Sequence, residues 1–294
     1  MSIKAYVYLT IAALCWGGNA VAGKLAIGHI SPMMLTFWRW AFAFMLIVAI
    51  SVPQLKKDWP LLKQNWLLLM VLGVIGYTSF NAFLYTAVLY TTAINVAIEQ
   101  AGIPVLIFIA NFLLYRTRVS LAQIVGFAVT LLGIALTASH GDLMSLAQLT
   151  LNFGDALMML AVVAYTVYTL LLRWRPPIHW KSLMALPALG ALLASVPLLG
   201  WEAAAGNAIW PDASGWAIAL WTSIFASLVA QILYVMGVDG IGPNRAGLFI
   251  NLVPVFGTLL SVLLVGEDLQ LFHVIALVLA LGGIAIAERG RPRQ

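Results

Sequence analysis

The chain has 294 residues, of which 63% are hydrophobic and only 9% are charged, and its mean hydropathy is +1.01. Soluble domains carry about 25% charged residues, so this composition excludes a soluble protein, which would aggregate through its apolar surface. The net charge of +5 does not indicate nucleic-acid binding, because no basic cluster with interleaved aromatic residues accompanies it.

The apolar stretches are continuous and do not alternate with polar residues, which favours transmembrane α-helices of about 20 residues over a β-barrel. We therefore predict an all-α polytopic membrane protein with ten transmembrane helices. The predicted helices cover residues 5–27, 33–52, 66–88, 93–114, 120–139, 153–172, 183–200, 215–236, 243–265 and 271–288.

The first predicted helix has two interpretations. Lys4 precedes an apolar stretch that runs into the small residues Ala20-Val21-Ala22, as in a secretory signal. Cleavage would leave nine helices and remove part of the internal repeat described below. We therefore expect the segment to be retained, with Asn19 facing a cavity and Lys24 near its outer mouth.

The positive residues predict the orientation of the chain. With a cytoplasmic amino terminus, 13 of the 15 Lys and Arg residues fall in cytoplasmic segments, and the exceptions are Lys24 and Arg39. The outer loops then hold the acids Asp142, Glu202, Asp212, Glu267 and Asp268. Because Lys and Arg are retained inside, we expect a protein of the bacterial inner (plasma) membrane with both termini cytoplasmic.

Ionisable residues within the predicted helices need an explanation, because each costs about 2.5–3.5 kcal/mol on insertion. Glu99 is the only acid deep in a predicted helix, with Asn95 one turn before it, and Lys24 and Arg39 lie at similar depth. One hypothesis pairs Glu99 with one of the two basic residues and leaves the other for a substrate carboxylate, which a planar guanidinium suits better. The alternative is that both basic side chains extend to the outer surface, with Glu99 as a structural partner.

Polar and aromatic residues recur at helical spacing on other predicted helices and are candidates to line a cavity. With the residues above, the candidates are Trp16, Asn19, Lys24, Arg39, Tyr77, Asn81, Tyr85, Asn95, Glu99, Tyr165, Tyr168, Gln231, Tyr234 and Asn251. Hydrogen bonds between helices, worth about 0.6 kcal/mol each, are the alternative explanation. A lining of Trp and Tyr favours flat or amphipathic solutes, including aromatic amino acids.

Two halves of the chain are similar to each other. Residues 96–137 align without gaps over residues 246–287, which matches Pro104 with Pro254 and "LLGIAL" (131–136) with "LGGIAI" (281–286). Five helices per copy is an odd number, so the second copy has to be inverted, as in many secondary transporters. We expect repeats at 1–144 and 145–294, with Pro104 and Pro254 as paired hinges; chance similarity of apolar segments is the alternative.

The chain resembles the EamA-type drug/metabolite transporter superfamily over nearly its whole length. The resemblance lies in "ALCWGGNAVAGKLA" (13–26), "SPMMLTFWRWAFAF" (31–44), residues 91–136, "GDALMMLAVVAYTVYTLLLR" (154–173) and residues 242–286. It implies a ten-helix bundle that exports or exchanges small metabolites, often amino acids, through a central cavity. One departure is Arg116-Thr117-Arg118, where such proteins carry a Gly-Glu-like turn, and another is the lack of an Arg39 equivalent in the seventh helix.

Other classes of function are disfavoured. His29, His140, His179 and His273 are scattered, no His-Glu-x-x-His motif occurs, and Asp155 is expected at the membrane interface. We therefore expect no enzyme, no metal site and no cofactor. The alternative that stays open is a channel or facilitative pore. The expected partners are a small-molecule substrate and the lipid bilayer, but not nucleic acid, and the chain is either a monomer or a homodimer. Glu99 is the candidate proton carrier, and exchange without a coupling ion is equally compatible with the sequence.

Overall fold

The described residues of the computed structural model, 3–115, 120–142, 152–241, 246 and 248–289, form helices and their connections. Eight helical segments are long and apolar enough to cross a membrane, and two shorter apolar helices cover Phe249–Val265 and Leu271–Ala287. These ten segments coincide with the ten predicted ones, although the seventh and eighth are longer than expected, at Trp180–Ala204 and Ala213–Ile241. The prediction of an all-α, ten-helix membrane protein is confirmed.

The first half contains five membrane segments, the third and fourth of which are built from shorter pieces. Its elements are α1 (Ile3–Leu25), α2 (Pro32–Ala49), α3 (Val52–Gln64), α4 (Trp66–Leu72), the π-helix η1 (Gly73–Ser79), α5 (Phe80–Ala87), α6 (Ala93–Glu99), α7 (Gly102–Tyr115) and α8 (Leu121–Ala138).

The second half repeats this order, and its eighth and ninth membrane segments are also composite. Its elements are α10 (Phe153–Leu171), the short 3₁₀ helix η2 (Leu172–Trp174), α11 (Trp180–Ala204), α12 (Ala213–Trp221), the π-helix η3 (Thr222–Val229), α13 (Ala230–Ile241), the 3₁₀ helix η4 (Leu248–Leu252), α15 (Val253–Leu260), the π-helix η5 (Ser261–Val265) and α16 (Leu271–Arg289). The boundary expected between the repeats, at 144/145, lies outside the described residues.

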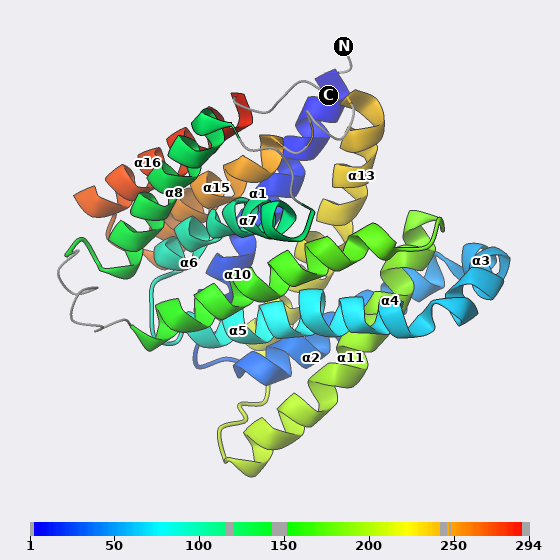
Figure 1. The fold of residues 1–294 in the computed structure, drawn as a ribbon. Helices are drawn as coiled ribbons and strands as arrows, with labels where there is room; N and C mark the ends of the chain where they lie inside the picture. The colour runs from blue at the N-terminus through cyan, green and yellow to red at the C-terminus, as the bar shows by residue number, and fades with distance from the viewer. Residues whose placement is uncertain (1–2, 116–119, 143–151, 242–245, 247, 290–294) are drawn as a thin grey trace.

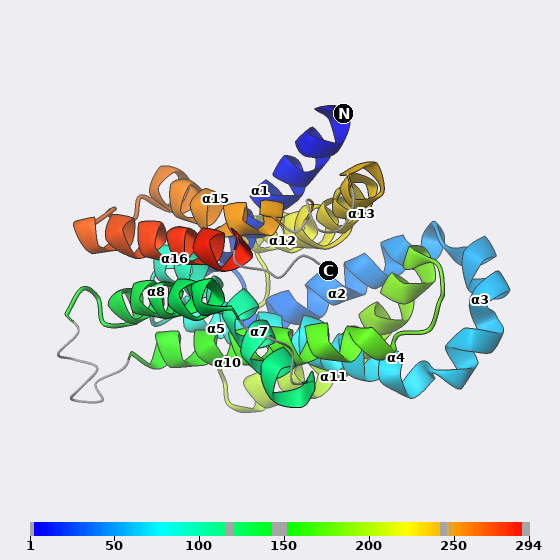
Figure 2. The same ribbon diagram turned by 45° about the horizontal axis from the view of Figure 1, so that its top comes forward.

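Helix α3 was not expected, since the sequence analysis left residues 53–65 between two membrane helices. It carries exposed Lys56, Lys57 and Lys63, and the Trp59 side chain is 60% exposed. Leu62 is buried. A basic helix with an exposed tryptophan is typical of the membrane surface, and α3 lies at one end of the bundle beyond α4 and α11 (Figures 1 and 2).

The packing of the helices follows an inverted repeat. Helix α1 packs against α13 and α15, and its counterpart α10 packs against α5 and α7, the counterparts of α13 and of the ninth segment. Three further contacts join a helix to its own counterpart: α2 with α11, α8 with α16, and α6 with α15. Exchanging each segment with the one five positions later therefore reproduces these contacts.

The α8–α16 contact shows why glycines recur in this chain. These two helices lie side by side in both views (Figures 1 and 2). A Cβ atom added at Gly283 would lie 2.3 Å from the carbonyl oxygen of Gly126, and one added at Gly126 would lie 2.4 Å from that of Gly283. Membrane helices pack by close approach of this kind, because lipid supplies no hydrophobic drive for their association.

Interruptions of the helices also occur in equivalent places in the two halves. The π-helices η1 and η3 begin at Gly73 and Thr222, which are 149 positions apart. The fourth segment is broken between Glu99 and Gly102, just before Pro104, and the ninth changes from 3₁₀ to α-helix at Val253, just before Pro254. Proline removes a backbone donor and favours such breaks, and broken or π-helical turns are common at functional sites.

Two sides of the molecule can be distinguished. We call the side on which α1 begins and α16 ends the terminal side, and the opposite side the distal side. On the distal side, two glutamates of the second half bind helix amino termini of the first. Glu202 accepts hydrogen bonds from Ser31 Oγ (2.5 Å) and from the backbone amides of Met33 (3.1 Å) and Met34 (3.2 Å). Glu267 accepts them from the amides of Ala93 (2.8 Å) and Ile94 (2.9 Å). Because a helix amino terminus favours an anion, these contacts hold the distal ends of the two halves together.

Candidate functional site

Arg39 lies at the centre of a polar cluster formed by four membrane segments. Its side chain projects from α2, and the residue is only 5% exposed. Nε donates a hydrogen bond to Ser227 Oγ (3.0 Å), and Nη1 donates to Asn81 Oδ1 (2.8 Å), Tyr85 Oη (2.5 Å) and Asn19 Oδ1. Tyr85 Oη in turn donates to Asn19 Oδ1 at 2.8 Å. We call these five residues the Arg39 cluster.

The described part of the protein supplies no counter-charge for Arg39. Each of its hydrogen-bond partners is a neutral side chain, and no described carboxylate lies within ion-pair distance of it. The remaining nitrogen of the guanidinium, Nη2, makes no hydrogen bond within the described part of the chain. A buried charge without a partner is costly, so this arrangement favours the binding of an external anion.

A row of aromatic rings extends from the Arg39 cluster. The Arg39 guanidinium lies 5.2 Å from the ring centroid of Trp40, which stacks on Tyr77 with centroids 4.4 Å apart and an interplanar angle of 6°. The Tyr77 and Tyr168 centroids are 5.6 Å apart, and those of Tyr168 and Tyr165 are 5.3 Å apart. These four residues form what we call the aromatic row, which could stack a planar or amphipathic solute.

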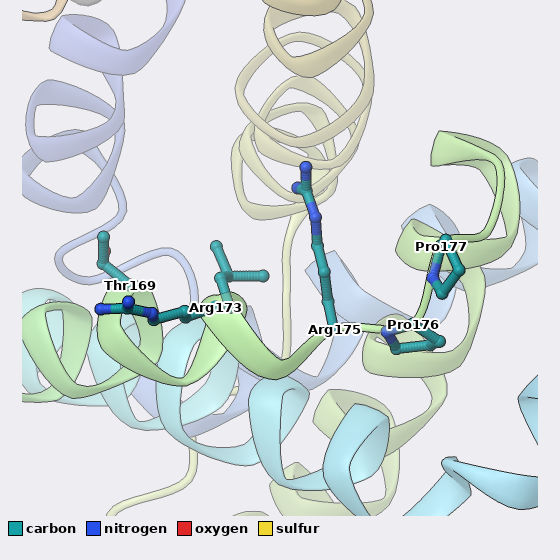
Figure 3. Close-up of a pocket in the computed structure, with 6 residues that line it drawn as sticks. Thr169, Arg173, Arg175, Pro176 and Pro177 are labelled. Atoms are coloured by element: carbon teal, nitrogen blue, oxygen red, sulfur yellow. The ribbon is translucent and has the colours of Figure 1, made fainter.

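An open pocket of about 630 Å³ lies on the terminal side, at the end of α10. Thr169 and Leu172 line this pocket, and they lie one turn beyond Tyr165 and Tyr168 along the same helix. Arg173, Arg175, Pro176 and Pro177 complete the lining. Figure 3 shows Arg175 extending into the open space beside the end of α10, while Arg173 lies along the helix near Thr169. The mouth of the pocket is therefore basic.

The distal side has no opening of this size among its described pockets. The pocket found there is lined by residues such as Gly23, Ala26 and Tyr85, and its volume is only about 10 Å³. Tyr85 belongs to the Arg39 cluster, so this small pocket lies next to the cluster. The larger terminal pocket is lined by none of the residues of the Arg39 cluster or of the aromatic row.

The ion pair expected between Glu99 and a basic residue does not form. Lys24 Nζ donates hydrogen bonds to the carbonyl oxygens of Val88 and Thr91, both at 2.8 Å. These carbonyl groups lie just beyond the carboxyl terminus of α5, where the helix dipole favours a cation. Arg39 is held by its neutral cluster, and the two carboxylate oxygens of Glu99 have no hydrogen-bond partner. The alternative, in which both basic side chains extend to the outer surface, is wrong for Arg39, because its side chain does not reach that surface.

The other candidates fall into three groups. Trp16 and Tyr234 contact each other, with ring centroids 5.3 Å apart. Asn95 and Glu99 are completely buried and belong to a second polar group, with Asp155. Gln231 and Asn251 are half-buried, and no hydrogen bond joins them to the Arg39 cluster within the described residues.

Two features of the structure were missed by sequence reasoning. Asp155, expected at an interface, is 1% exposed and accepts a hydrogen bond from Thr91 Oγ1 at 2.5 Å. Glu202, expected in an outer loop, is 5% exposed and lies in the last turn of α11. The only local signal was that a helix starts nearby and needs a hydrogen-bond acceptor there: α10, after Asn152, in the case of Asp155, and α2, after Ser31, in the case of Glu202. Neither helix start shows that the acid is buried.

Comparisons with known proteins agree with this architecture. The EamA-like transporter family matches the chain twice, over residues 3–139 and 152–288. The uncharacterised transporter YyaM of Bacillus subtilis is 25% identical over 97% of this chain and 94% of its own length. The uncharacterised inner membrane transporter YicL of Salmonella typhimurium is 22% identical over 99% and 97%. A crystal structure of another protein, 19% identical in sequence, superposes over 100% of both chains with a TM-score of 0.66, which shows the shared fold.

Proposed function

We propose, from the premise that this chain belongs to the EamA-like transporter family, that it transports amino acids, including aromatic ones, by alternating access. The chain is a membrane transporter and not an enzyme. The identity of the substrate and the alternating mechanism are the proposal.

The observation that carries the proposal is the uncompensated charge of Arg39. An amino acid brings a carboxylate, which a planar guanidinium binds through parallel hydrogen bonds. The neutral Asn19, Asn81 and Tyr85 leave that charge available and offer further donors and acceptors to the amino group. The aromatic row lies next to the guanidinium, where the side chain of a bound aromatic amino acid would stack.

The inverted halves support alternating access. A carrier with two inverted halves can open to either side by exchanging their conformations around a central site. The 630 Å³ pocket on the terminal side and the closed distal side correspond to one of these two states. We place the terminal side in the cytoplasm of a bacterial inner membrane, since most Lys and Arg residues lie on that side. The division between the repeats at 144/145 and the hinge role of Pro104 and Pro254 belong to the same proposal.

Counterflow in proteoliposomes tests the substrate class. Vesicles loaded with an unlabelled amino acid should accumulate the labelled one, and a panel that includes phenylalanine, tyrosine and tryptophan should compete. Absence of saturable counterflow for every amino acid would contradict the proposal, and an ohmic current would indicate a pore instead.

Substitution of Arg39 tests the site. We expect Arg39→Lys to raise the substrate concentration for half-maximal counterflow by about 10- to 100-fold, because a charged hydrogen bond contributes about 1.5–3 kcal/mol. Arg289→Gln removes an exposed arginine at the end of α16 and should behave as the wild type. Thermal unfolding of both variants in detergent checks that they fold, and an unchanged affinity in folded Arg39→Lys would show that Arg39 does not bind substrate.

A further inference from the structure

A second polar group in the membrane region lies apart from the Arg39 cluster. It contains Asn95 and Glu99 on α6, Asp155 on α10, and Thr91 just before α6. Asn95 and Glu99 are 0% exposed and Asp155 is 1% exposed. Neither described pocket is lined by these residues. We call them, with His140, the Glu99 group.

The unpartnered atoms of this group are all hydrogen-bond acceptors. They are Oδ1 of Asn95 and both carboxylate oxygens of Glu99, whereas Oδ2 of Asp155 has only the His140 ring near it. Glu99 and Asp155 also lie close enough for their charges to interact. Buried polar atoms in native proteins almost always have partners, and two nearby carboxylates cannot both be charged at low cost. The group therefore lacks a proton, or another cation, that would bind these oxygen atoms.

A series of contacts connects the group to the distal surface. His140 Nε2, whose side chain is 46% exposed, lies 3.3 Å from Asp155 Oδ2. Thr91 Oγ1 donates to Asp155 Oδ1 at 2.5 Å and accepts from Asn95 Nδ2 at 3.1 Å. Asn95 and Glu99 are then one helical turn apart on the same face. Histidine exchanges protons near neutral pH and is a common proton shuttle, so His140 and Asp155 can admit a proton, while Thr91 and Asn95 hold Asp155 in place.

The two acids have different surroundings. Asp155 lies in the first turn of the 19-residue helix α10, where the amino terminus stabilises a negative charge, and it is paired with Thr91 and His140. Glu99 has no donor and is the last residue of α6, at the break before α7. A protonated Glu99 would have a hydroxyl group to donate, and the unpartnered Asn95 Oδ1 lies on the same face to receive it. One proton bound to Glu99 therefore neutralises one of the two carboxylates and supplies a hydrogen-bond donor for Asn95 Oδ1.

The position of Glu99 links proton binding to conformational change. Broken helices supply the coupling-ion sites of several kinds of secondary transporter. The amino terminus of α6 is held by Glu267 of the second half, and α6 itself packs on α1, α10, α15 and α16. The charged or titratable groups near the distal ends of the neighbouring elements are Asp155 on α10, Lys24 on α1, Glu267 after η5, His140 after α8 and His273 on α16, whereas α15 contributes none.

We propose that Glu99 is the proton-binding site of this transporter, reached from the distal side by way of His140 and Asp155, and that transport is coupled to this proton. Only the coupling of transport to the proton rests on the proposed function. Proton binding at Glu99 can be tested without knowledge of the substrate.

Carbodiimide labelling tests the proton site directly. Dicyclohexylcarbodiimide reacts with protonated carboxyl groups in apolar surroundings, and labelled peptides can be identified by mass spectrometry. We expect labelling at Glu99 that decreases as the pH is raised and does not change with Na⁺ concentration. Glu202 is an internal control, because it is also buried but accepts three hydrogen bonds, and it should stay unlabelled. Absence of label at Glu99, or protection by Na⁺ at constant pH, would overturn the proposal.

Transport in proteoliposomes tests the coupling. With counterflow established at equal pH, a pH gradient should change wild-type accumulation by up to about tenfold per pH unit for one coupled proton. Glu99→Gln should abolish this response, and Asp268→Asn, which removes an exposed distal acid, should retain it. A full pH response in folded Glu99→Gln would overturn the coupling. If wild-type counterflow is absent, the proposed function fails, whereas the labelling result still decides the proton site.

Discussion

Three buried charged residues of this chain are accommodated in three different ways. Glu202 accepts three hydrogen bonds from the amino-terminal end of α2, Arg39 donates only to neutral side chains, and Glu99 has no partner at all. A satisfied charge is a structural element, whereas an unsatisfied one implies a ligand. The difference separates Glu202 from the two residues to which we assign binding roles.

Glu202 should therefore affect stability. In Glu202→Ala, Ser31 Oγ and the amides of Met33 and Met34 lose their acceptor in a buried place. We expect a loss of about 2–3 kcal/mol in the free energy of unfolding, seen as a lower midpoint of thermal unfolding in detergent. The exposed Asp268→Ala serves as the control and should leave the midpoint nearly unchanged. Equal midpoints for the two variants would show that the distal contact does not stabilise the fold.

At the level of elements, the site depends on irregular helices and on very close packing. The π-helices η1 and η3 lie in equivalent segments, and the Arg39 cluster draws Asn81 from just after the first and Ser227 from within the second. A π-turn rotates the residues that follow it relative to a regular helix. The two irregular turns therefore help to determine which polar side chains face Arg39.

Neighbouring glycines on α16 provide a matched test of the packing. In Gly283→Ala the new Cβ would lie 2.3 Å from the Gly126 carbonyl oxygen, whereas at Gly282 nothing lies within 4 Å. We expect Gly283→Ala to destabilise the protein by about 1–3 kcal/mol through overpacking. Gly282→Ala should be neutral or stabilise by up to about 1 kcal/mol, because alanine favours a helix. Unfolding midpoints in detergent measure both, and equal effects would contradict the close α8–α16 contact.

At the level of the whole molecule, the proposed alternating access requires an open and a closed side. The terminal pocket is lined by Thr169, and the small distal pocket by Ala26, which is 3% exposed. Because Cys15 is the only cysteine of the chain, its replacement by alanine leaves a background for new labels.

Accessibility of introduced cysteines tests this arrangement. In the Cys15→Ala background, we expect Thr169→Cys to react with a membrane-impermeant maleimide in inside-out vesicles. Ala26→Cys should be protected from the outside in the state described here and should become reactive when the carrier turns over. Reaction of Thr169→Cys in intact cells but not in inside-out vesicles would show that the proposed orientation is wrong.

The sequence alone determined the all-helical membrane fold, the ten segments, the repeat and the family. The fold and the segments follow from composition, because lipid accepts only apolar stretches of a given length. The repeat follows from the internal similarity of the two halves, and the family from the resemblance. Most residues of the Arg39 cluster were also predicted, since Asn19, Arg39, Asn81 and Tyr85 are conspicuously polar at membrane depth.

Only the tertiary structure decided which polar groups meet. Arg39 and Ser227 are 188 positions apart, and Thr91 and Asp155 are 64 apart. Such contacts depend on the rotation of each helix about its axis, which the breaks at Gly102 and the π-turns alter. The expected pairing of Glu99 with Lys24 or Arg39 was wrong for this reason, because similar depth in the membrane does not place two side chains on facing surfaces.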